Sequence, residues 1–313
     1  MPKEEFILKQ LLIKILDFLI KNKIKFKDFI HHYYDVFYQK KHKPPIIMSC
    51  EETINYILKT NCSVSRFGDA EVKLISGKNV CYQVATDEVK AELRKVLGSD
   101  KKNLLVCLPS VFTDDDLSVF IASTEKFWKR HLSYCRKFWY QDLIKNKTYG
   151  NAFISRCYID LKDKGENIGQ YFNLIKKLWD NRDIIIVEGE KSRLGMGNDL
   201  FDNTKSVRRI LGPSNQGFSK YSELLEEIKK QDKNSLILLA LGPTATILPY
   251  DLCDLGYQAI DIGNIDTEYE WYKMNAKVKV PIQNKMVYEA GAGAGVGDVD
   301  DEKYNSEIIS KIL

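Results

Sequence analysis

Two carboxylates and a cation lie close together in the stretch SVSRFGDAEVKLI, residues 63–75. Asp69 and Glu71 are two positions apart, and Arg66 and Gly68 precede them. In an extended loop both acids can reach one Mg²⁺ or Mn²⁺, ions that prefer oxygen ligands and also bind phosphate. Gly68 lets a ligand approach the backbone, and Arg66 suits a diphosphate. The alternative is a helix that starts here, with Asp69 as its N-cap and both acids favouring its dipole.

A second D-x-E pattern occurs in DIGNIDTEYEW, residues 261–271, where Asp266 and Glu268 lie beside Tyr269 and Trp271. Acids next to aromatic rings suit sugar recognition, because carboxylates bind hydroxyl groups and rings stack on sugars. The chain has four histidines, and they fall early in the sequence, so a histidine base is not expected. A general base, if the protein uses one, is then expected to be a carboxylate.

Two further loops could bind an anion. The first begins at Glu188 and Gly189 and offers Ser192, Arg193 and backbone amides to a phosphate or ribose. Its glycines fit neither a dinucleotide fingerprint nor a P-loop, so an irregular turn before a helix is the alternative. The second, LGPTAT, places the set Gly242, Pro243 and Thr244 at a helix start. Its free amides can receive an anion, or the proline can serve ordinary capping.

The elements that must position these loops alternate along the chain. Apolar runs predict strands, most of them without polar alternation, which is typical of parallel strands covered on both faces. These runs span 62–67, 103–109, 183–189, 235–243 and 257–263. Helical patterns occupy 167–180, 219–231 and 244–256. We therefore predict an α/β fold: a Rossmann-like, doubly wound, mostly parallel sheet with helices on both faces. Because all four polar loops follow strands, they should meet at the carboxyl edge of that sheet.

The first 45 residues differ from the remainder. Residues 1–44 hold ten lysines and five acids, whereas the whole chain carries a net charge of only +4. Residues 4–40 predict one or two helices with a wide apolar face, and KKHKPP at 40–45 ends them. This extension either packs on protein, including a second subunit of a homo-oligomer, or lies on a membrane surface with its lysines toward anionic head groups. Residues 46–313 form the main domain.

Composition limits the classes of function. The small net charge gives no support for nucleic-acid binding. Seven scattered cysteines without a CxxC pair are typical of free thiols in a reducing compartment. No secretory signal is evident, so we expect a cytoplasmic protein, with peripheral contact to the inner face of the cell membrane as a variant.

Four long blocks, in order, resemble the GT-D-type glycosyltransferases, bacterial enzymes that build surface polysaccharides and adhesin glycans. They are SRFGDAE, FISRCYID (153–160), residues 187–221 and residues 239–271. The resemblance covers roughly residues 48–313, as expected for one domain. Two departures from the pattern are Ala70, where we expect glycine, and Asn264, where we expect histidine.

The resemblance implies transfer of a sugar from a UDP-sugar to a glycan or lipid-linked glycan acceptor. It implies that Asp69 and Glu71 hold a divalent metal, Mn²⁺ or Mg²⁺, on the diphosphate. It leaves Asp266 or Glu268 as the candidate base or sugar ligand. The alternatives are another nucleotide-dependent enzyme on a similar sheet, or a non-catalytic scaffold of a glycan-assembly complex.

Overall fold

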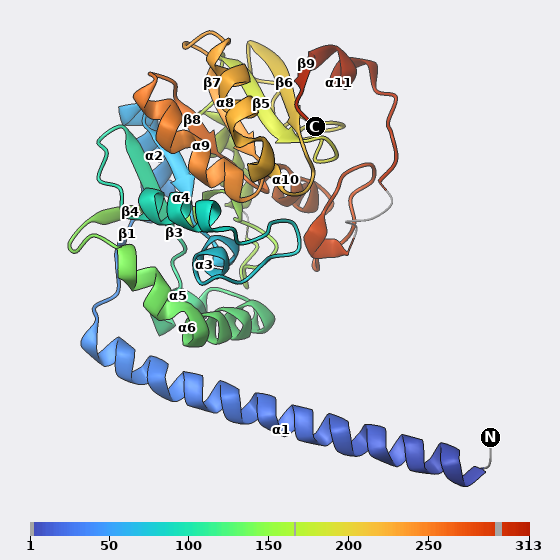
Figure 1. The fold of residues 1–313 in the computed structure, drawn as a ribbon. Helices are drawn as coiled ribbons and strands as arrows, with labels where there is room; N and C mark the ends of the chain where they lie inside the picture. The colour runs from blue at the N-terminus through green and yellow to red at the C-terminus, as the bar shows by residue number, and fades with distance from the viewer. Residues whose placement is uncertain (1–2, 166, 292–295) are drawn as a thin grey trace.

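The computed structural model describes residues 3–165, 167–291 and 296–313, whose nine strands form one sheet (Figure 1). The strand order is β1-β4-β3-β2-β8-β7-β5-β6-β9, and all pairings are parallel. The strands are β1 (Ile46–Ile47), β2 (Ser63–Arg66), β3 (Leu104–Leu108), β4 (Thr148–Asn151), β5 (Asp183–Gly189), β6 (Ser206–Gly212), β7 (Leu236–Ala240), β8 (Ala259–Asp261) and β9 (Ile308–Lys311). The α-helices are α1 (Lys3–Lys41), α2 (Cys50–Thr60), α3 (Asp69–Ile75), α4 (Asp87–Leu97), α5 (Asp114–Ser118), α6 (Ala122–Asp142), α7 (Ile168–Lys176), α8 (Tyr221–Lys229), α9 (Pro243–Asp254), α10 (Ile265–Lys273) and α11 (Glu302–Glu307).

The sheet is buried on both faces, as the continuous apolar runs predict. Along β5, Ile184 and Ile186 pack into one cluster with α2, α7 and α10. The alternate residues Ile185 and Val187 pack on the opposite face against α8 and α9. Because side chains of a strand alternate between faces, both faces need apolar residues. The predicted α/β doubly wound sheet is confirmed.

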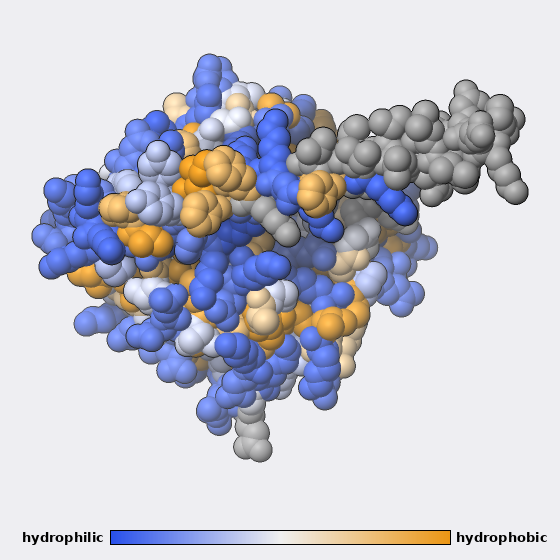
Figure 2. All heavy atoms as spheres, turned by 90° about the horizontal axis from the view of Figure 1, so that it is seen from below, coloured by the Kyte–Doolittle hydropathy of each residue, from blue (hydrophilic) through white to orange (hydrophobic). Residues whose placement is uncertain are grey.

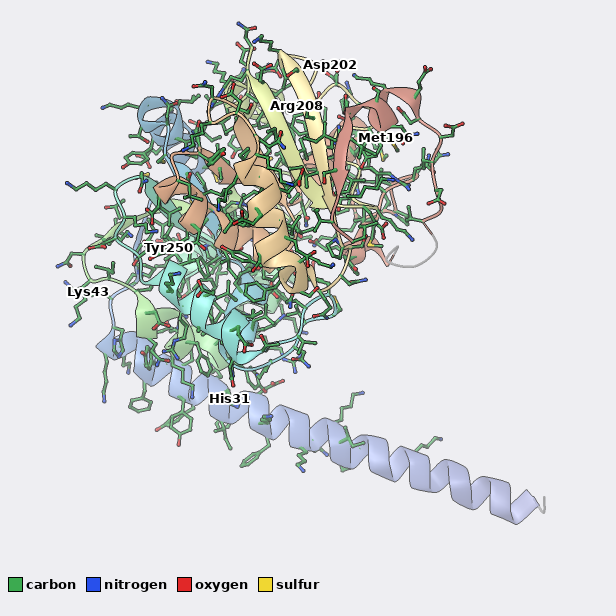
Figure 3. The ribbon with its side chains drawn as sticks, turned by 45° about the horizontal axis from the view of Figure 1, so that its top comes forward. His31, Lys43, Met196, Asp202, Arg208 and Tyr250 are labelled. Atoms are coloured by element: carbon green, nitrogen blue, oxygen red, sulfur yellow. The ribbon has the colours of Figure 1, made fainter. Side chains whose placement is uncertain are left out.

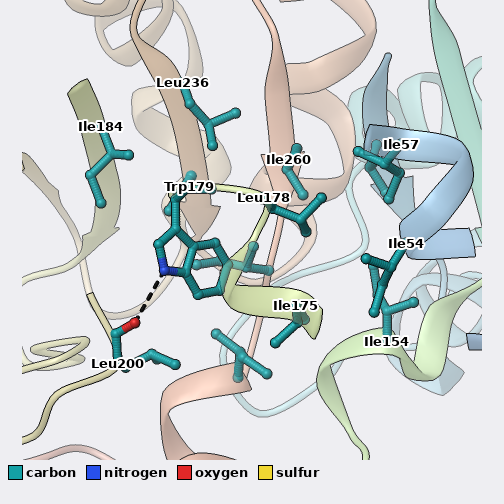
Figure 4. Close-up of a cluster of buried hydrophobic side chains, with 14 of the residues drawn as sticks. Ile54, Ile57, Ile154, Ile175, Leu178, Trp179, Ile184, Leu200, Leu236 and Ile260 are labelled. Atoms are coloured by element: carbon teal, nitrogen blue, oxygen red, sulfur yellow. Dashed lines mark hydrogen bonds between the residues drawn. The ribbon is translucent and has the colours of Figure 1, made fainter. Parts of the chain in front are cut away.

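One side of the sheet is organised around Trp179, which is fully buried (Figure 4). Its ring packs among aliphatic residues from α2, α7 and the strands, and its indole N–H donates to the carbonyl oxygen of Leu200 at 3.1 Å. A buried indole needs such an acceptor. The bond therefore ties the loop after β5 to the core.

The order of the strands creates a switch point between β2 and β8. From β2 the chain crosses to β3 on one side, whereas from β8 it continues through α10 to β9 at the opposite edge of the sheet. The connections leaving the two strands therefore diverge and leave a crevice outside their carboxyl ends. In open α/β sheets such a crevice is where ligands bind.

The N-terminal segment is a single helix, α1. Its C-terminal part lies along α6, and its N-terminal part extends past the main domain (Figure 1). Asp35 accepts a hydrogen bond from Arg136 Nε at 2.6 Å, and both side chains are buried. The Tyr134 hydroxyl donates to Asp28 at 2.6 Å. The helix ends at Lys41, within the break predicted at residues 40–45. Among the described residues, no helix combines the length and the apolar content that crossing a bilayer requires.

Candidate active site

A cleft of about 1020 Å³ opens at the carboxyl edge of the sheet, over the switch point. Its wall includes residues from all four predicted polar loops, those after β2, β5, β7 and β8. The predicted site residues that line it are Arg66, Gly68, Asp69, Glu71, Gly189, Ser192, Gly242, Pro243 and Asp266. The expectation that the four loops meet at one place is therefore met by the geometry.

The floor of the cleft is an ion pair that joins β2 to β8. Arg66 Nη2 donates to Asp261 Oδ1 at 2.8 Å, and Arg66 Nε donates to the Asp261 carbonyl oxygen at 2.7 Å. Arg66 Nη1 donates to the carbonyl oxygen of Ala152 at 2.9 Å. A Cβ at Gly263 would lie 1.9 Å from Arg66 Nη2, so this close approach requires glycine. Three of the five N–H groups of Arg66 are therefore used to hold β2, β8 and the segment of Ala152 together at the switch point.

The first D-x-E pair stands in the first turn of α3, at the edge of the cleft. Gly68, not Asp69, is the N-cap, and its N–H donates to the Glu71 carboxylate at 2.7 Å. The helix start anticipated in the structural alternative is therefore present, with another residue as cap. Both acids also line the cleft. The helix start and the predicted metal site therefore involve the same two residues.

The two acids differ in their surroundings. Glu71 is buried, and burial raises its pKa to about 7, with a further contribution from the charges of Asp261 and Asp69. Asp69 is one-third exposed and forms an ion pair with Lys73 at 2.5 Å. The negative charges of Asp69 and Asp261 thus disfavour ionisation of Glu71, and a cation bound nearby would favour it.

The second D-x-E pair, in the first turn of α10, is engaged in structural bonds. Asp266 Oδ1 accepts from the Gly195 N–H at 2.8 Å and from Asn198 at 2.7 Å, while Oδ2 accepts from Lys285 at 2.7 Å. Asp266 reaches the cleft wall with both oxygens already engaged. The geometry gives no support to its predicted role as a base.

Glu268 lies outside the cleft. Its Oε2 accepts the backbone N–H groups of Tyr158 at 2.8 Å and Ile159 at 3.0 Å, and burial raises its pKa to about 7. The carboxylate therefore holds the chain segment that follows β4. Glu268 is not among the residues that line the cleft, and the geometry gives no support to its predicted role as base or sugar ligand.

Three other predicted ligand residues also lie outside the cleft. Glu188 is fully buried and accepts from Arg209 Nη1 and from the Leu194 N–H, both at 2.7 Å. Arg193 donates to two backbone carbonyl oxygens, each at 2.7 Å. Thr244 is buried in the first turn of α9. These three residues are not among those that line the cleft, and their predicted contact with a ligand stays a prediction.

Comparison with known proteins identifies the architecture. The family described as "Glycosyltransferase GT-D fold" matches residues 64–290.

The chain belongs to the GT-D-fold glycosyltransferase family.

Two relatives support this assignment. Glycosyltransferase GlyD of Streptococcus pneumoniae serotype 4 is 43% identical over 268 residues, 85% of this chain and 32% of the relative. Probable glycosyl transferase Gly of Streptococcus gordonii is 40% identical over 267 residues, 85% of this chain and 39% of the relative. The chain therefore spans about a third of the length of these curated relatives.

Two solved structures share the fold. One is described as a new glycosyltransferase from Streptococcus sanguinis, with a TM-score of 0.82 and 39% identity over 86% of this chain and all of that chain. The other is described as a domain with a distinct glycosyltransferase fold. It has a TM-score of 0.82 and 38% identity over 91% of this chain and all of that one.

The GT-D cleft also contains a charged cluster that our sequence analysis did not single out. Arg156 binds Glu289 and also Asp160, the latter at 2.8 Å, and Lys279 lies 3.0 Å from Glu289. Asn264, one of the departures from the family pattern, donates to Glu289 at 2.9 Å. Burial alone would raise the pKa of Glu289, but Arg156 and Lys279 hold it at about 2. In the sequence, Arg156 belongs to the block FISRCYID but has no motif that assigns it a role. The segment around Lys279 has no helix or strand pattern that would place it near the cleft.

Proposed function

We propose that this chain is a metal-dependent glycosyltransferase that moves a sugar from a UDP-sugar donor to a growing surface glycan. The observation that carries the proposal is the convergence of the loops after β2, β5, β7 and β8 on one cleft, with Asp69 and Glu71 at its edge. Donor, metal and acceptor would share that cleft. Membership of the GT-D family supplies the reaction class.

The donor diphosphate would lie over the switch point, where a helix N-terminus and several cationic side chains line the cleft. The N-terminus of α9, from Gly242, opens onto the cleft and presents backbone N–H groups and the positive end of the helix dipole. Arg66 also lines the cleft, and two of its five N–H groups bind neither Asp261 nor Ala152. Arg156 and Lys279 add cations on the wall that includes Glu289.

Asp69 and Glu71 would hold the divalent metal. Across the described residues, no cluster of three or more His, Cys, Asp or Glu side chains is arranged to bind an ion. Two carboxylates are nevertheless sufficient for Mg²⁺ or Mn²⁺ when substrate phosphates and water complete the coordination. Asp69 and Glu71 both line the cleft, and a cation there would also offset the charges that, after burial, raise the pKa of Glu71. When bound, the ion would offset charge that develops on the UDP leaving group.

The transfer itself joins an acceptor hydroxyl oxygen to the anomeric carbon as the bond from that carbon to UDP breaks. The protein residues bind the diphosphate and orient the anomeric carbon toward the open side of the cleft. Asp266, through both carboxylate oxygens, and Glu268, through Oε2, bind the surrounding chain and so hold the cleft wall.

The test is a panel of UDP-sugars, with Mn²⁺ or Mg²⁺, in which release of UDP to water is measured without any acceptor. Glu71→Gln should lower this hydrolysis on the order of 100-fold, because an amide is a weak metal ligand. Glu52→Gln is the matched control, since Glu52 caps α2 through Ser49 as Glu71 caps α3 through Gly68. Glutamine preserves the cap in both helices.

Two results would contradict the proposal. One is the absence of metal-dependent hydrolysis of every UDP-sugar, which would favour a scaffold. The other is equal activity of Glu71→Gln and Glu52→Gln, which would remove Glu71 from the site. Hydrolysis of another class of nucleotide sugar would retain glycosyl transfer and change the donor.

A further inference from the structure

Helix α1 has two opposite faces with different surroundings. Its inner face packs on α6: the His31 ring lies 4.0 Å from the Tyr134 ring, and the Tyr38 ring lies 5.7 Å from the Tyr140 ring, measured between centroids. Asp28 and Asp35 belong to the same face by helical spacing. Figure 3 shows His31 where α1 meets the main domain, and side chains of α1 that project away from it.

The outer face carries a stripe of exposed aromatic rings. Phe26, Phe29, Tyr33 and Phe37 follow at intervals of three and four residues, so they share one side of the helix. Their exposed fractions are 65%, 66%, 55% and 47%. Four large rings exposed side by side on one helix are unusual on a soluble monomer and mark a surface that binds something.

The charges around this stripe have one sign. Among the α1 side chains that the structure describes, Lys14, Lys21, Lys23, Lys40 and Lys41 are exposed. The described acids, Asp28 and Asp35, both turn toward α6, where Tyr134 and Arg136 bind them. Figure 2 looks onto the side where α1 lies and shows apolar and hydrophilic side chains interleaved. The outward charge of the described part of α1 is therefore positive.

We propose that the aromatic stripe of α1 binds an anionic lipid surface. Aromatic rings on a helix that lies in the membrane interface enter the head-group region, and flanking lysines are attracted to acidic lipids. A second copy of this chain is a poorer occupant, because two such faces would bring lysines against lysines. Charge complementarity thus favours lipid over self-association.

The same arrangement connects the proposed membrane surface to the cleft. One part of α6 holds α1, while its first two turns contribute Ser123, Thr124, Phe127 and Trp128 to the cleft wall. If the proposed function is correct, an acceptor carried on a lipid would be presented near the donor. The lipid contact itself stands independently of the donor chemistry.

The test is co-sedimentation of the full chain with vesicles of phosphatidylcholine alone or mixed with phosphatidylglycerol. We expect binding to the mixed vesicles and much weaker binding to the neutral ones. Replacing Phe26, Phe29 and Tyr33 together by serine should abolish the binding. Lys21→Gln with Lys23→Gln should weaken it about 25-fold, at about fivefold per lysine. The matched control is Lys229→Gln with Lys230→Gln at the C-terminal end of α8, which should leave binding unchanged.

Several outcomes would overturn the proposal. They are no sedimentation with phosphatidylglycerol vesicles, equal binding to neutral vesicles, or equal effects of the α1 and α8 lysine variants. A concentration-dependent dimer that the serine variant dissociates, without lipid binding, would identify a second copy as the occupant. The substituted side chains are exposed, so circular dichroism and Tm should match the parent. UDP-sugar hydrolysis of the serine variant in solution should also match, which separates this test from that of the proposed function.

Discussion

The two D-x-E pairs have the same spacing and the same local setting, yet the structure uses them differently. Asp69 and Glu71 begin α3 after β2, and Asp266 and Glu268 begin α10 after β8, on the two sides of the switch point. Burial raises the pKa of Glu71 and of Glu268 to about 7. Both acids of the first pair line the cleft and accept few hydrogen bonds, whereas the second pair accepts several from the chain around it and only Asp266 reaches the cleft. The groups that donate to each carboxylate, and not the motif, decide what the acid can do.

Burial of the second pair has an energetic reason. A buried carboxylate is costly unless donors satisfy it, and Asp266 and Glu268 each accept several hydrogen bonds. In return they fix three segments that have no regular structure of their own. The first pair has fewer donors and so retains capacity for a ligand.

The lysine partners of the two pairs give the sharpest contrast in stability. Lys285 is buried and lies 2.7 Å from Asp266, so Lys285→Met should lower the free energy of unfolding by about 3–5 kcal/mol by leaving a buried charge unpaired. Lys73→Met removes the partly exposed partner of Asp69 and should change it by about 1 kcal/mol or less. Urea denaturation measures both. Equal losses would mean that the two pairs have equivalent surroundings.

Glu268 itself should contribute mainly to stability. Glu268→Ala leaves the N–H groups of Tyr158 and Ile159 without their acceptor, which should cost about 2–4 kcal/mol in the free energy of unfolding. Glu302→Ala, at an exposed acid in the first turn of α11, is the control and should stay within about 0.5 kcal/mol. Thermal and urea unfolding of the two variants check this. A Glu268→Ala protein of normal stability that has lost hydrolysis would restore a catalytic role.

The pH dependence of metal binding should separate two glutamates that share a pKa of about 7. Protonated Glu71 cannot ligate an ion, so the apparent affinity for Mn²⁺ should rise roughly tenfold per pH unit below the pKa and level off above it. Titrations between pH 5.5 and 8.5 measure this. Glu71→Gln should flatten the profile, and Glu268→Gln should leave it intact. A flat profile in the parent, or loss of the slope in Glu268→Gln, would contradict the assignment.

The sequence predicted the elements whose information is local. The apolar runs of β5 and β7 and the helical period of α8 were sufficient to place them. Strand β6 was missed because Arg208 and Arg209 interrupt its apolar pattern. Arg209 is buried in the structure by ion pairs with Glu188 and Glu307, which lie 21 and 98 residues away in the chain.

The same distinction explains what could be foreseen of the site. That polar loops meet at the carboxyl edge follows from strand direction alone, so the positions of Asp69 and Glu71 at the cleft were predictable. The donors to Asp266 and Glu268 come from residues up to 71 and 110 positions away, respectively. No local sequence pattern indicates these donors. In the sequence alone, the second D-x-E pair could therefore not be distinguished from the first.

The approach of Gly263 to Arg66 has a consequence for how this family can vary. Gly263 has a φ of +42°, and there is no space for a Cβ beside the Arg66 guanidinium. Position 263 can therefore accept a larger residue only if that guanidinium moves away. The ion pair to Asp261 would then be lost as well. Positions 66, 261 and 263 should therefore covary among homologous sequences, and a side chain at 263 should accompany a shorter residue at 66.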